Sequence, residues 1–547
     1  MQKEFRLISS LEKIFFDIPK NMPEHNSGSM LKNEIYSFQL ACCVTDGGKT
    51  MLPCSIEIKS ELKEYITVYQ IGYVPSQVPA YTFTKDENFI SKAPGLYPDT
   101  MNKIYNKEFS MVNGQACALW FSVEPNCMIS GCYPIEIEIF SEDKKSLIKK
   151  VFNLNIINKT LPPQKLINTC WFHGDCLAEL HGLEINSEKY FETVEKYLDV
   201  YTKFGHNMIL TPIFTPPLDT DEGSERPTNQ LVDVFLHDGA YSFGFEKLEL
   251  WIELCKKYGI KYYEISHLFT QWGAKYTPKI MAETDDGFKR IFGWDVDAVS
   301  DEYRNFIDAF MPRLIEFLKK KSVFENCFFH VSDEPTKEHT EQYRAARELL
   351  VPYIPENQLM DALSDYVFYE TGLVKKPVVC NDHIKAFMDH DIKDLWTYYC
   401  CCQYDGVSNR FMAMPSARNR ILGCQLYKYD IEGFLQWGFN FWFTQRSREV
   451  INPYAVTDAG GAFPSGDSFV VYPLNKQGDV VTSLRLYVFN EGLQDLRALE
   501  LLEEIKGSEY TKGLLDDISG FDKYPKDAEY ILKLREKINS EIEKFHF

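Results

Sequence analysis

Asn326-Cys327-Phe328-Phe329-His330-Val331-Ser332-Asp333-Glu334-Pro335 is the stretch that most clearly indicates the fold of this chain. It begins as an apolar run long enough for one buried strand and ends in two adjacent carboxylates and a proline. The preceding segment, 300–321, has the apolar period of a helix, with Ser300 as its expected cap and Pro312 as the expected site of a kink. A helix followed by a buried strand indicates a parallel α/β fold, in which ligands bind at the carboxyl ends of the strands.

The same alternation of strand and helix continues on both sides of this stretch. Further helices are expected over 188–204, 247–258, 483–505 and 527–545, and further strands over 166–172, 208–211, 261–265, 358–363, 378–380, 395–399 and 438–442. About eight strands over roughly 280 residues match the size of a (β/α)8 barrel. A doubly wound open sheet is the alternative, but no Gly-rich dinucleotide loop follows the first expected strand.

The N-terminal part of the chain has a different pattern. Its β-rich segments, separated by Gly and Pro, are 36–41, 66–69, 118–123, 133–139 and 151–156. Because no helical period accompanies them, we expect an antiparallel β-sandwich. Leu161-Pro162-Pro163-Gln164 is the expected linker. The predicted organisation is therefore a β-sandwich at 1–162, a (β/α)8 TIM-like catalytic barrel at 165–505 and a C-terminal helical extension at 506–547.

Length and charge limit the class of protein. A chain of 547 residues is too long for one compact core. The net charge of -20 argues against nucleic acid as a partner and against binding to anionic membranes. No segment approaches the ~18 apolar residues of a membrane span, so we expect no membrane insertion. The 14% aromatic content suits carbohydrate handling and suits a large α/β core equally well.

Cysteine usage and the N-terminal residues bear on compartment and cofactors. Fifteen scattered cysteines and a charged N-terminus without an apolar region predict a reducing, cytoplasmic location. Cys400-Cys401-Cys402 looks like a metal-binding tract, but consecutive strand residues point to opposite faces of a sheet. No His-Glu-x-x-His or paired Cys-x-x-Cys pattern occurs, so we expect neither a metal nor an organic cofactor.

The adjacent carboxylates Asp333 and Glu334 are the candidate catalytic residues. If their strand is the fourth, Glu334 lies where many barrel glycosidases place an acid/base. A protein nucleophile would need a second carboxylate about 5 Å away, usually from another strand. The segment 396–399 offers aromatic side chains instead, which favours a 2-acetamido group of the substrate as nucleophile. An ionised Asp333 is then expected to raise the pKa of Glu334. Alternatively, an Asp-Glu pair before proline can simply be a turn or a helix start.

Other side chains near strand ends are candidates for substrate binding. A lone histidine is often structural and an aromatic residue often packs in a core, and these interpretations stay open. Strand alternation implies that only one of two consecutive tyrosines points into the barrel. Arg485 is expected to pair with Asp467 or Asp495. The candidates are His173, Asp175, His267, Tyr398, Tyr399, Trp437 and Trp442.

The chain resembles glycoside hydrolase family 123 and the uncharacterised barrel families related to it, nearly from end to end. The resemblance rests on the segments 36–40, 120–125, 131–133, 332–335, 435–442, 466–467, 472–473, 483–485 and 491–495. It implies a β-sandwich followed by a (β/α)8 barrel, and release of β-linked N-acetylgalactosamine by retaining, substrate-assisted catalysis through an oxazolinium intermediate. It also implies that Asp333 orients the acetamide and that Glu334 is the acid/base. A β-glycosidase with a protein nucleophile and a non-catalytic carbohydrate-binding protein are the alternatives.

Overall fold

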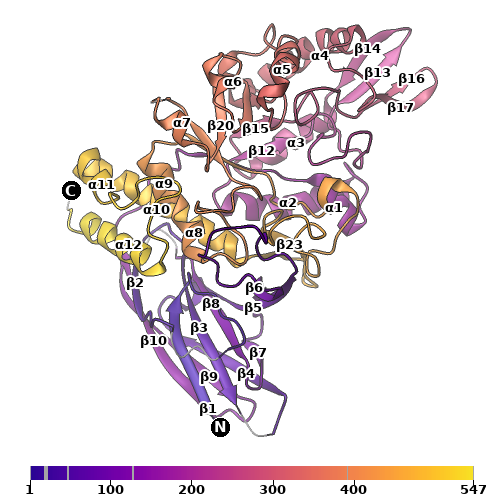
Figure 1. Cartoon of the computed structure of the whole chain (residues 1–547). Coiled ribbons are helices and arrows are strands. Elements are labelled where there is room, and N and C mark those ends of the chain that lie inside the picture. Colours follow the sequence, from indigo (N-terminus) through magenta and orange to yellow (C-terminus); the bar gives the residue numbers. More distant parts are fainter. Residues whose placement is uncertain (1, 18–21, 46–47, 126–128, 391, 546–547) are drawn as a thin grey trace.

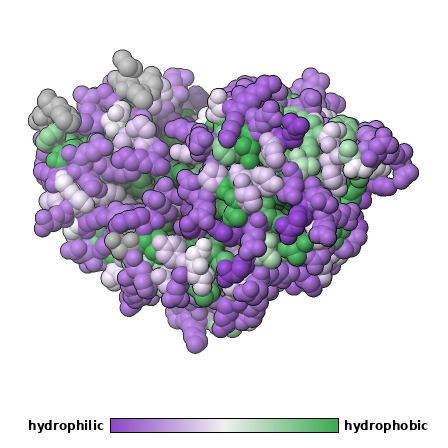
Figure 2. Space-filling view, turned by 90° about the horizontal axis from the view of Figure 1, so that it is seen from above, coloured by the Kyte–Doolittle hydropathy of each residue, from purple (hydrophilic) through white to green (hydrophobic). Residues whose placement is uncertain are grey.

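The structure is a computed structural model that describes residues 2–17, 22–45, 48–125, 129–390 and 392–545. The chain is multidomain and rich in β-structure, with N-terminal sheets at one end and an α/β part at the other (Figure 1). The face seen in Figure 2 is mainly hydrophilic, with smaller apolar patches. None of the helices in the described residues is long and apolar enough to cross a bilayer.

Two five-stranded sheets make up the N-terminal part. One has the order β1 (Gln2–Ser9), β3 (Tyr36–Thr45), β8 (Ala116–Val123), β5 (Ile66–Ser76) and β6 (Gly95–Lys103). The other has the order β2 (Ser27–Leu31), β10 (Ser146–Ile157), β9 (Gly131–Ser141), β4 (Met51–Lys59) and β7 (Glu108–Val112). The pairs are antiparallel as predicted, except that β2 runs parallel to β10.

The two sheets share one apolar core. The ring of Phe38 from β3 stacks on Phe121 of the same sheet at 4.9 Å and on Phe152 of the other sheet at 4.0 Å. Along β9, buried Ile135, Ile137 and Ile139 alternate with two glutamates, as the period-two pattern requires. Burial of alternate residues therefore holds the sheets face to face.

The α/β part contains an eight-stranded parallel sheet in which sequence neighbours are also spatial neighbours. An isolated parallel bridge between Phe329 and Leu359 joins the two ends of the sheet, so the sheet is nearly closed. Its inward-facing residues form an apolar cluster of their own. The strands are β11 (Ile167–Cys170), β12 (Met208–Thr211), β15 (Tyr262–Ile265), β18 (Cys327–Phe329), β19 (Met360–Leu363), β20 (Lys376–Cys380), β21 (Trp396–Tyr398) and β22 (Gly433–Gln436).

Helical segments follow each of the first seven strands. In order along the chain they are α1 (Gly174–His181), α2 (Glu188–Lys203), α3 (Glu246–Lys257), α4 (Asp301–Lys320), α5 (Thr340–Arg347), α6 (Val367–Glu370), α7 (Lys385–Met388), α8 (Ser416–Arg420) and α9 (Leu422–Lys428). The predicted helix at 300–321 is confirmed as α4, and the hydroxyl of Ser300 accepts the Tyr303 N–H. The helix continues through Pro312.

Two hairpins and a small ribbon are inserted into this order. The strands β13 (Asp233–His237), β14 (Ala240–Gly244), β16 (Ile280–Thr284) and β17 (Gly287–Phe292) form a four-stranded sheet, and β23 (Val471–Leu474) pairs with β24 (Val480–Thr482). The sequence pattern did not indicate these insertions.

One predicted strand is wrong. The eighth barrel strand is β22, and the segment 438–442 that we expected to be a strand is irregular. Its backbone is held by hydrogen bonds from Phe439 N–H to Trp171 O (3.1 Å) and from Phe441 N–H to Ser468 O (3.1 Å). A Cβ on Gly438 would lie 2.3 Å from the Ser468 carbonyl oxygen. The segment is therefore apolar because it packs in the core, not because it pairs in a sheet.

Three helices end the chain: α10 (Leu484–Lys506), α11 (Ser508–Gly513) and α12 (Ala528–Glu543). Helices α10 and α12 lie next to the N-terminal sheets, and α11 lies at the left edge of the molecule in Figure 1. We expected Arg485 of α10 to pair with Asp467 or Asp495. It instead forms a bidentate ion pair with buried Asp99 of β6, with N···O distances of 2.7 and 2.9 Å. Arg535 of α12 bonds to Asp495 of α10 and to buried Glu34. Buried charge pairs therefore connect the two ends of the chain. His546 and Phe547 of the predicted extension lie outside the described residues.

Candidate active site

A cavity of about 280 Å³ lies where the barrel strands end. Its lining comes from residues in or just after several strands, which is the position that ligands occupy in parallel α/β barrels. Both predicted catalytic carboxylates line it. The lining includes Trp171, His173, Asp219, Trp272, Asp333, Glu334, Tyr398, Trp437 and Phe441.

The carboxylates of Asp333 and Glu334 are aimed by a constrained turn after β18, which is the fourth strand of the barrel as expected. Glu334 has a φ of +44°, in a region that residues with a side chain rarely adopt, least of all before a proline. The turn is fixed from both sides. Trp272 N–H donates to Asp333 O at 2.8 Å, and Glu334 N–H donates to Ala362 O at 3.1 Å. Strain of this kind, about 1–3 kcal/mol, persists where surrounding contacts determine the backbone, and it concentrates at functional sites.

Tyr398 is the last residue of β21, and only Tyr398 of the two neighbouring tyrosines lines the cavity, as the predicted alternation requires. The Tyr398 hydroxyl donates a 2.6 Å hydrogen bond to Glu334 Oε1 inside the cavity. Tyr399 is not among the residues that line the cavity, and its ring packs edge-on against Phe434 at 5.0 Å. Its buried hydroxyl has no hydrogen-bond partner among the described residues.

Burial governs the titration of the two carboxyl groups. Burial, and then the negative charge of Glu334, raise the pKa of Asp333 well above its usual range. Burial also raises the pKa of Glu334, while the hydroxyl of Tyr398 opposes that rise. We expected the charge of Asp333 to raise the pKa of Glu334. The structure shows the reverse influence, in which the charge of Glu334 raises the pKa of Asp333. Burial is the main cause of both shifts, and each shift favours the protonated form of its carboxyl group.

Beneath the cavity lies a buried charged network that the sequence analysis missed. His330 donates from Nε2 to Glu264 Oε1 at 2.8 Å and from Nδ1 to Asp361 Oδ1 at 3.1 Å. Burial alone would lower the pKa of His330, but hydrogen bonds and charges from Asp361 and Glu264 raise it to about 10. A positively charged His330 therefore lies below the acid pair, and its charge favours the ionised form of Asp333.

The same network orients the aromatic floor of the cavity. Glu264 accepts hydrogen bonds of 2.7 Å from Trp171 Nε1 and from Thr169 Oγ1. Its carboxylate is completely buried inside the barrel. Glu264 lies within a predicted apolar strand, and a buried charged residue needs partners inside the core. This position was the sequence signal that could have revealed the network.

The comparisons with known proteins identify the family. The family model described as "Glycoside hydrolase 123, catalytic domain" matches residues 171–502, more than half of the chain. The chain belongs to glycoside hydrolase family 123. It is a glycoside hydrolase with a carbohydrate substrate. No curated protein sequence matches the chain.

Solved structures support the fold of the family. A family 123 glycoside hydrolase from Clostridium perfringens, whose structure concerns glycolipid glycan hydrolysis, has a TM-score of 0.74 at 14% identity, covering 99% of this chain and 97% of that one. A β-glucuronidase from Parabacteroides merdae has a TM-score of 0.29 at 10% identity, covering 89% of this chain and 51% of that one. The second likeness is too weak to carry an argument.

In this family 123 chain His173 lines the cavity as predicted, whereas Asp175 does not. Burial, and then the charge of Arg226, lower the pKa of His173 to about 3, so its ring is neutral. It donates from Nε2 to Trp437 O at 2.8 Å, and Nδ1 accepts from Arg226 at 3.2 Å. Asp175 forms a buried bidentate pair with Arg226 at 2.8 and 2.9 Å. Asp175 thus acts on the cavity only through Arg226 and His173.

The remaining candidates divide between the cavity and the core. Trp437 lines the cavity, and its Nε1 donates to Asp467 at 2.9 Å. Trp442 does not reach the cavity, because its ring packs against Tyr197 and its Nε1 donates to Val471 O at 3.2 Å. His267 is also outside the lining, where it stacks on His330 at 4.1 Å and both ring nitrogens lack partners among the described residues. The structure therefore does not bring Trp442 and His267 into the cavity wall, and their role in substrate binding stays a prediction.

Asp219 is a third carboxylate in the cavity wall, and sequence reasoning missed it. It follows β12 in a loop with a φ of +40°, and it accepts the Arg446 N–H at 2.8 Å. Burial raises the pKa of Asp219 to about 6. No periodic pattern surrounds this loop position, so the sequence carried no signal for it.

Three groups among the described residues bring possible metal ligands within 4.8 Å of one another. In the group of His267, His330 and Asp361, both ring nitrogens of His330 already bond to carboxylates, so His330 has no nitrogen left for a metal ion. The expected strand geometry of the cysteine tract is not observed, because the strand ends at Tyr398 and the cysteines form a turn. The groups are Cys400, Cys401 and Cys402; His267, His330 and Asp361; and Cys380, Asp382 and His383.

Proposed function

We propose that this family 123 enzyme releases β-linked N-acetylgalactosamine, or a related 2-acetamido sugar, by retaining, substrate-assisted catalysis. Glu334 protonates the glycosidic oxygen while the acetamide carbonyl oxygen attacks the anomeric carbon. The oxazolinium that results is opened by water, with Glu334 now acting as base. Asp333 orients the acetamide, and its ionised form, which the positive charge of His330 favours, balances the positive charge of the intermediate.

The observation that carries the proposal is the pair of neighbouring carboxylates facing one cavity. Adjacent residues cannot lie on opposite sides of a sugar ring, as an acid and a protein nucleophile must. Their placement suits one group at the leaving oxygen and one at the 2-substituent. Burial raises the pKa of Glu334, which favours the protonated form that a general acid needs near neutral pH.

Aromatic walls support a sugar as the occupant. Trp171, Trp437 and Phe441 line the cavity, and rings of this kind stack on the apolar faces of pyranosides. The Clostridium perfringens relative is described as acting on glycolipid glycans, so a glycolipid headgroup is a natural substrate to test here.

The fold is the scaffold in this proposal. We take the two N-terminal sheets as a β-sandwich at 1–162, the eight-stranded sheet with its helices as a (β/α)8 barrel at 165–505, and the remainder as a helical extension. The helical segment between successive strands and the cavity at the strand ends support this division.

The test compares wild-type enzyme with Glu334→Gln and Asp333→Asn on an aryl 2-acetamido-2-deoxy-β-galactoside, with Cys132→Ser as a surface control. Both carboxyl variants should lose about 10²- to 10⁴-fold in kcat/KM, and a thiazoline analogue should inhibit the wild type. Equal release by wild type and both carboxyl variants would remove these residues from the mechanism.

Asp219 favours one alternative, a protein nucleophile acting on sugars without an acetamide. It is a carboxylate from a different strand end that reaches the same cavity. Comparable turnover of a plain aryl β-galactoside, abolished by Asp219→Asn, would support that alternative over acetamide participation.

A further inference from the structure

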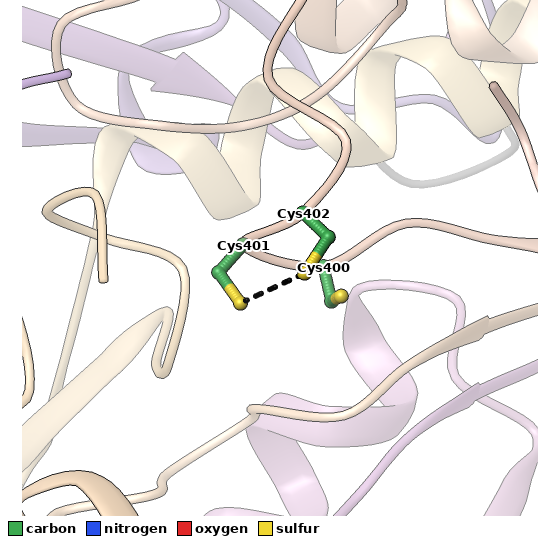
Figure 3. Close-up of side chains that lie close together, drawn as sticks. All are labelled: Cys400, Cys401 and Cys402. Atoms are coloured by element: carbon green, nitrogen blue, oxygen red, sulfur yellow. Dashed lines mark hydrogen bonds between the residues drawn. The ribbon is translucent and has the colours of Figure 1, made fainter. Parts of the chain in front are cut away.

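A turn of three consecutive cysteines faces the cavity, and the proposed mechanism does not use it. Cys400, Cys401 and Cys402 follow β21 and all line the cavity wall. Their sulfur atoms lie within 4.8 Å of one another, and those of Cys401 and Cys402 are 3.8 Å apart (Figure 3). Three thiols thus lie close together at the edge of the active site.

The turn is held by buried amide side chains. Cys400 N–H donates to Gln403 Oε1 at 2.9 Å, and Cys400 O accepts from Asn409 Nδ2 at 2.9 Å. Gln403 N–H closes the turn onto Cys400 O at 3.2 Å. Both amide residues are at most 4% exposed. The backbone that positions the sulfurs is therefore fixed without any contribution from the thiols.

The spacing of the sulfurs fits a tetrahedral thiolate site. A Zn²⁺ ion with Zn–S bonds of about 2.3 Å and tetrahedral angles separates two sulfur ligands by about 3.8 Å. The separation of Cys401 and Cys402 sulfurs is 3.8 Å. A disulfide would require about 2.05 Å and a different arrangement of the side chains.

The surroundings favour a cation. Glu334 lines the same cavity as the three cysteines, so a carboxyl group that can ionise lies near the turn. Metal binding deprotonates thiol ligands, and a divalent ion compensates the charge that this creates. The three cysteines border a cavity of about 280 Å³, which is large enough to admit a water molecule.

We propose that Cys400, Cys401 and Cys402 bind one soft divalent cation, with Zn²⁺ the best fit, through three thiolates. The fourth position opens on the cavity and takes a water molecule. This site is independent of the proposed glycosidase mechanism, because its ligands are not the acid pair.

The test measures metal binding by the full-length protein, chelator-washed and kept reduced. Zn²⁺ is titrated against a chromophoric chelator, and Cd²⁺ is added to reveal thiolate-to-cadmium charge-transfer absorption. We expect one equivalent of either ion, with weaker binding as the pH falls because protons compete for sulfur. Cys401→Ser and Cys402→Ser should each weaken binding by at least roughly tenfold, since even outer-shell changes cost about 10- to 100-fold.

Cys132→Ser, which alters an exposed cysteine of the N-terminal sheets, is the matched control and should bind as the wild type does. Thermal unfolding of each variant tests whether misfolding causes a loss of metal binding. Cys401 and Cys402 were chosen because they are the more exposed of the three cysteines. Failure to bind either ion overturns the proposal. So does undiminished binding in both variants, which would assign the ion to Cys380, Asp382 and His383.

Discussion

Replacing Tyr398 by phenylalanine tests how Glu334 is tuned. The change removes one 2.6 Å hydrogen bond to Glu334 Oε1 and leaves the ring in place. Glu334 becomes negatively charged as it gives up its proton, so the hydroxyl stabilises the transition state more than the ground state. A hydrogen bond to a charged group contributes about 1.5–3 kcal/mol, which corresponds to a loss of about 10- to 100-fold in kcat/KM.

The pH dependence gives the second readout. The Tyr398 hydroxyl lowers the pKa of Glu334, so its removal should raise that pKa and move the alkaline limb of kcat/KM to higher pH. The assay is a pH series with the aryl 2-acetamido-2-deoxy-β-galactoside.

Tyr399→Phe is the matched control, because it removes a buried hydroxyl that has no partner among the described residues and does not face the cavity. It should retain the wild-type rate and profile. Equal rates in the two variants, or an alkaline limb that moves to lower pH in Tyr398→Phe, would refute the reasoning.

Three further outcomes are expected. Asp333→Asn should lose turnover of 2-acetamido substrates by about 10²- to 10⁴-fold while changing thermal stability little, as activity assays and melting curves would reveal. His330→Gln should lower the free energy of unfolding by about 3–5 kcal/mol near neutral pH, because it leaves buried carboxylates uncompensated. Since the pKa of His330 is raised to about 10 from an ordinary value of about 6.5, this stabilisation is complete below about pH 6.5 and lost as pH rises through 10. Denaturant titrations of wild type and variant should therefore converge over that range, and a constant difference would contradict the assignment. Asp99→Asn should destabilise the protein by about 3–5 kcal/mol by leaving buried Arg485 without its charge partner, and a change under 1 kcal/mol would refute this.

Much of the barrel could be predicted because local signals agree there. Capping residues, helical apolar periods and short buried runs all indicated the same elements, and α4 ends within one residue of its expected boundary at 321. The eighth strand could not be placed, since β22 and the segment 438–442 are both apolar and aromatic. Hydrogen bonds from the segment 438–442 to the carbonyl oxygens of Trp171 and Ser468 hold it outside the sheet, and β22 is the segment that pairs in the sheet.

The acid pair could be predicted because a strand end followed by carboxylates is a local pattern. The supporting network could not, because Glu264, His330 and Asp361 come from separate segments and meet only through strand register. Glu264 lies opposite Phe328 in that register, two residues before His330. The turn at Cys400 to Cys402 could not be predicted for a related reason, since small differences in strand length decide whether neighbouring side chains alternate or lie close together.

The ion pair between Glu34 and Arg535 has a consequence for biosynthesis. The two residues are 501 positions apart, and both are buried in the finished protein. At about 5–20 residues per second, the ribosome delivers the arginine about 25–100 s after the glutamate. During that interval the nascent N-terminal sheets carry a carboxylate that awaits its counterion. The carboxylate of Glu34 therefore acquires this counterion only when a segment 501 positions later has been made.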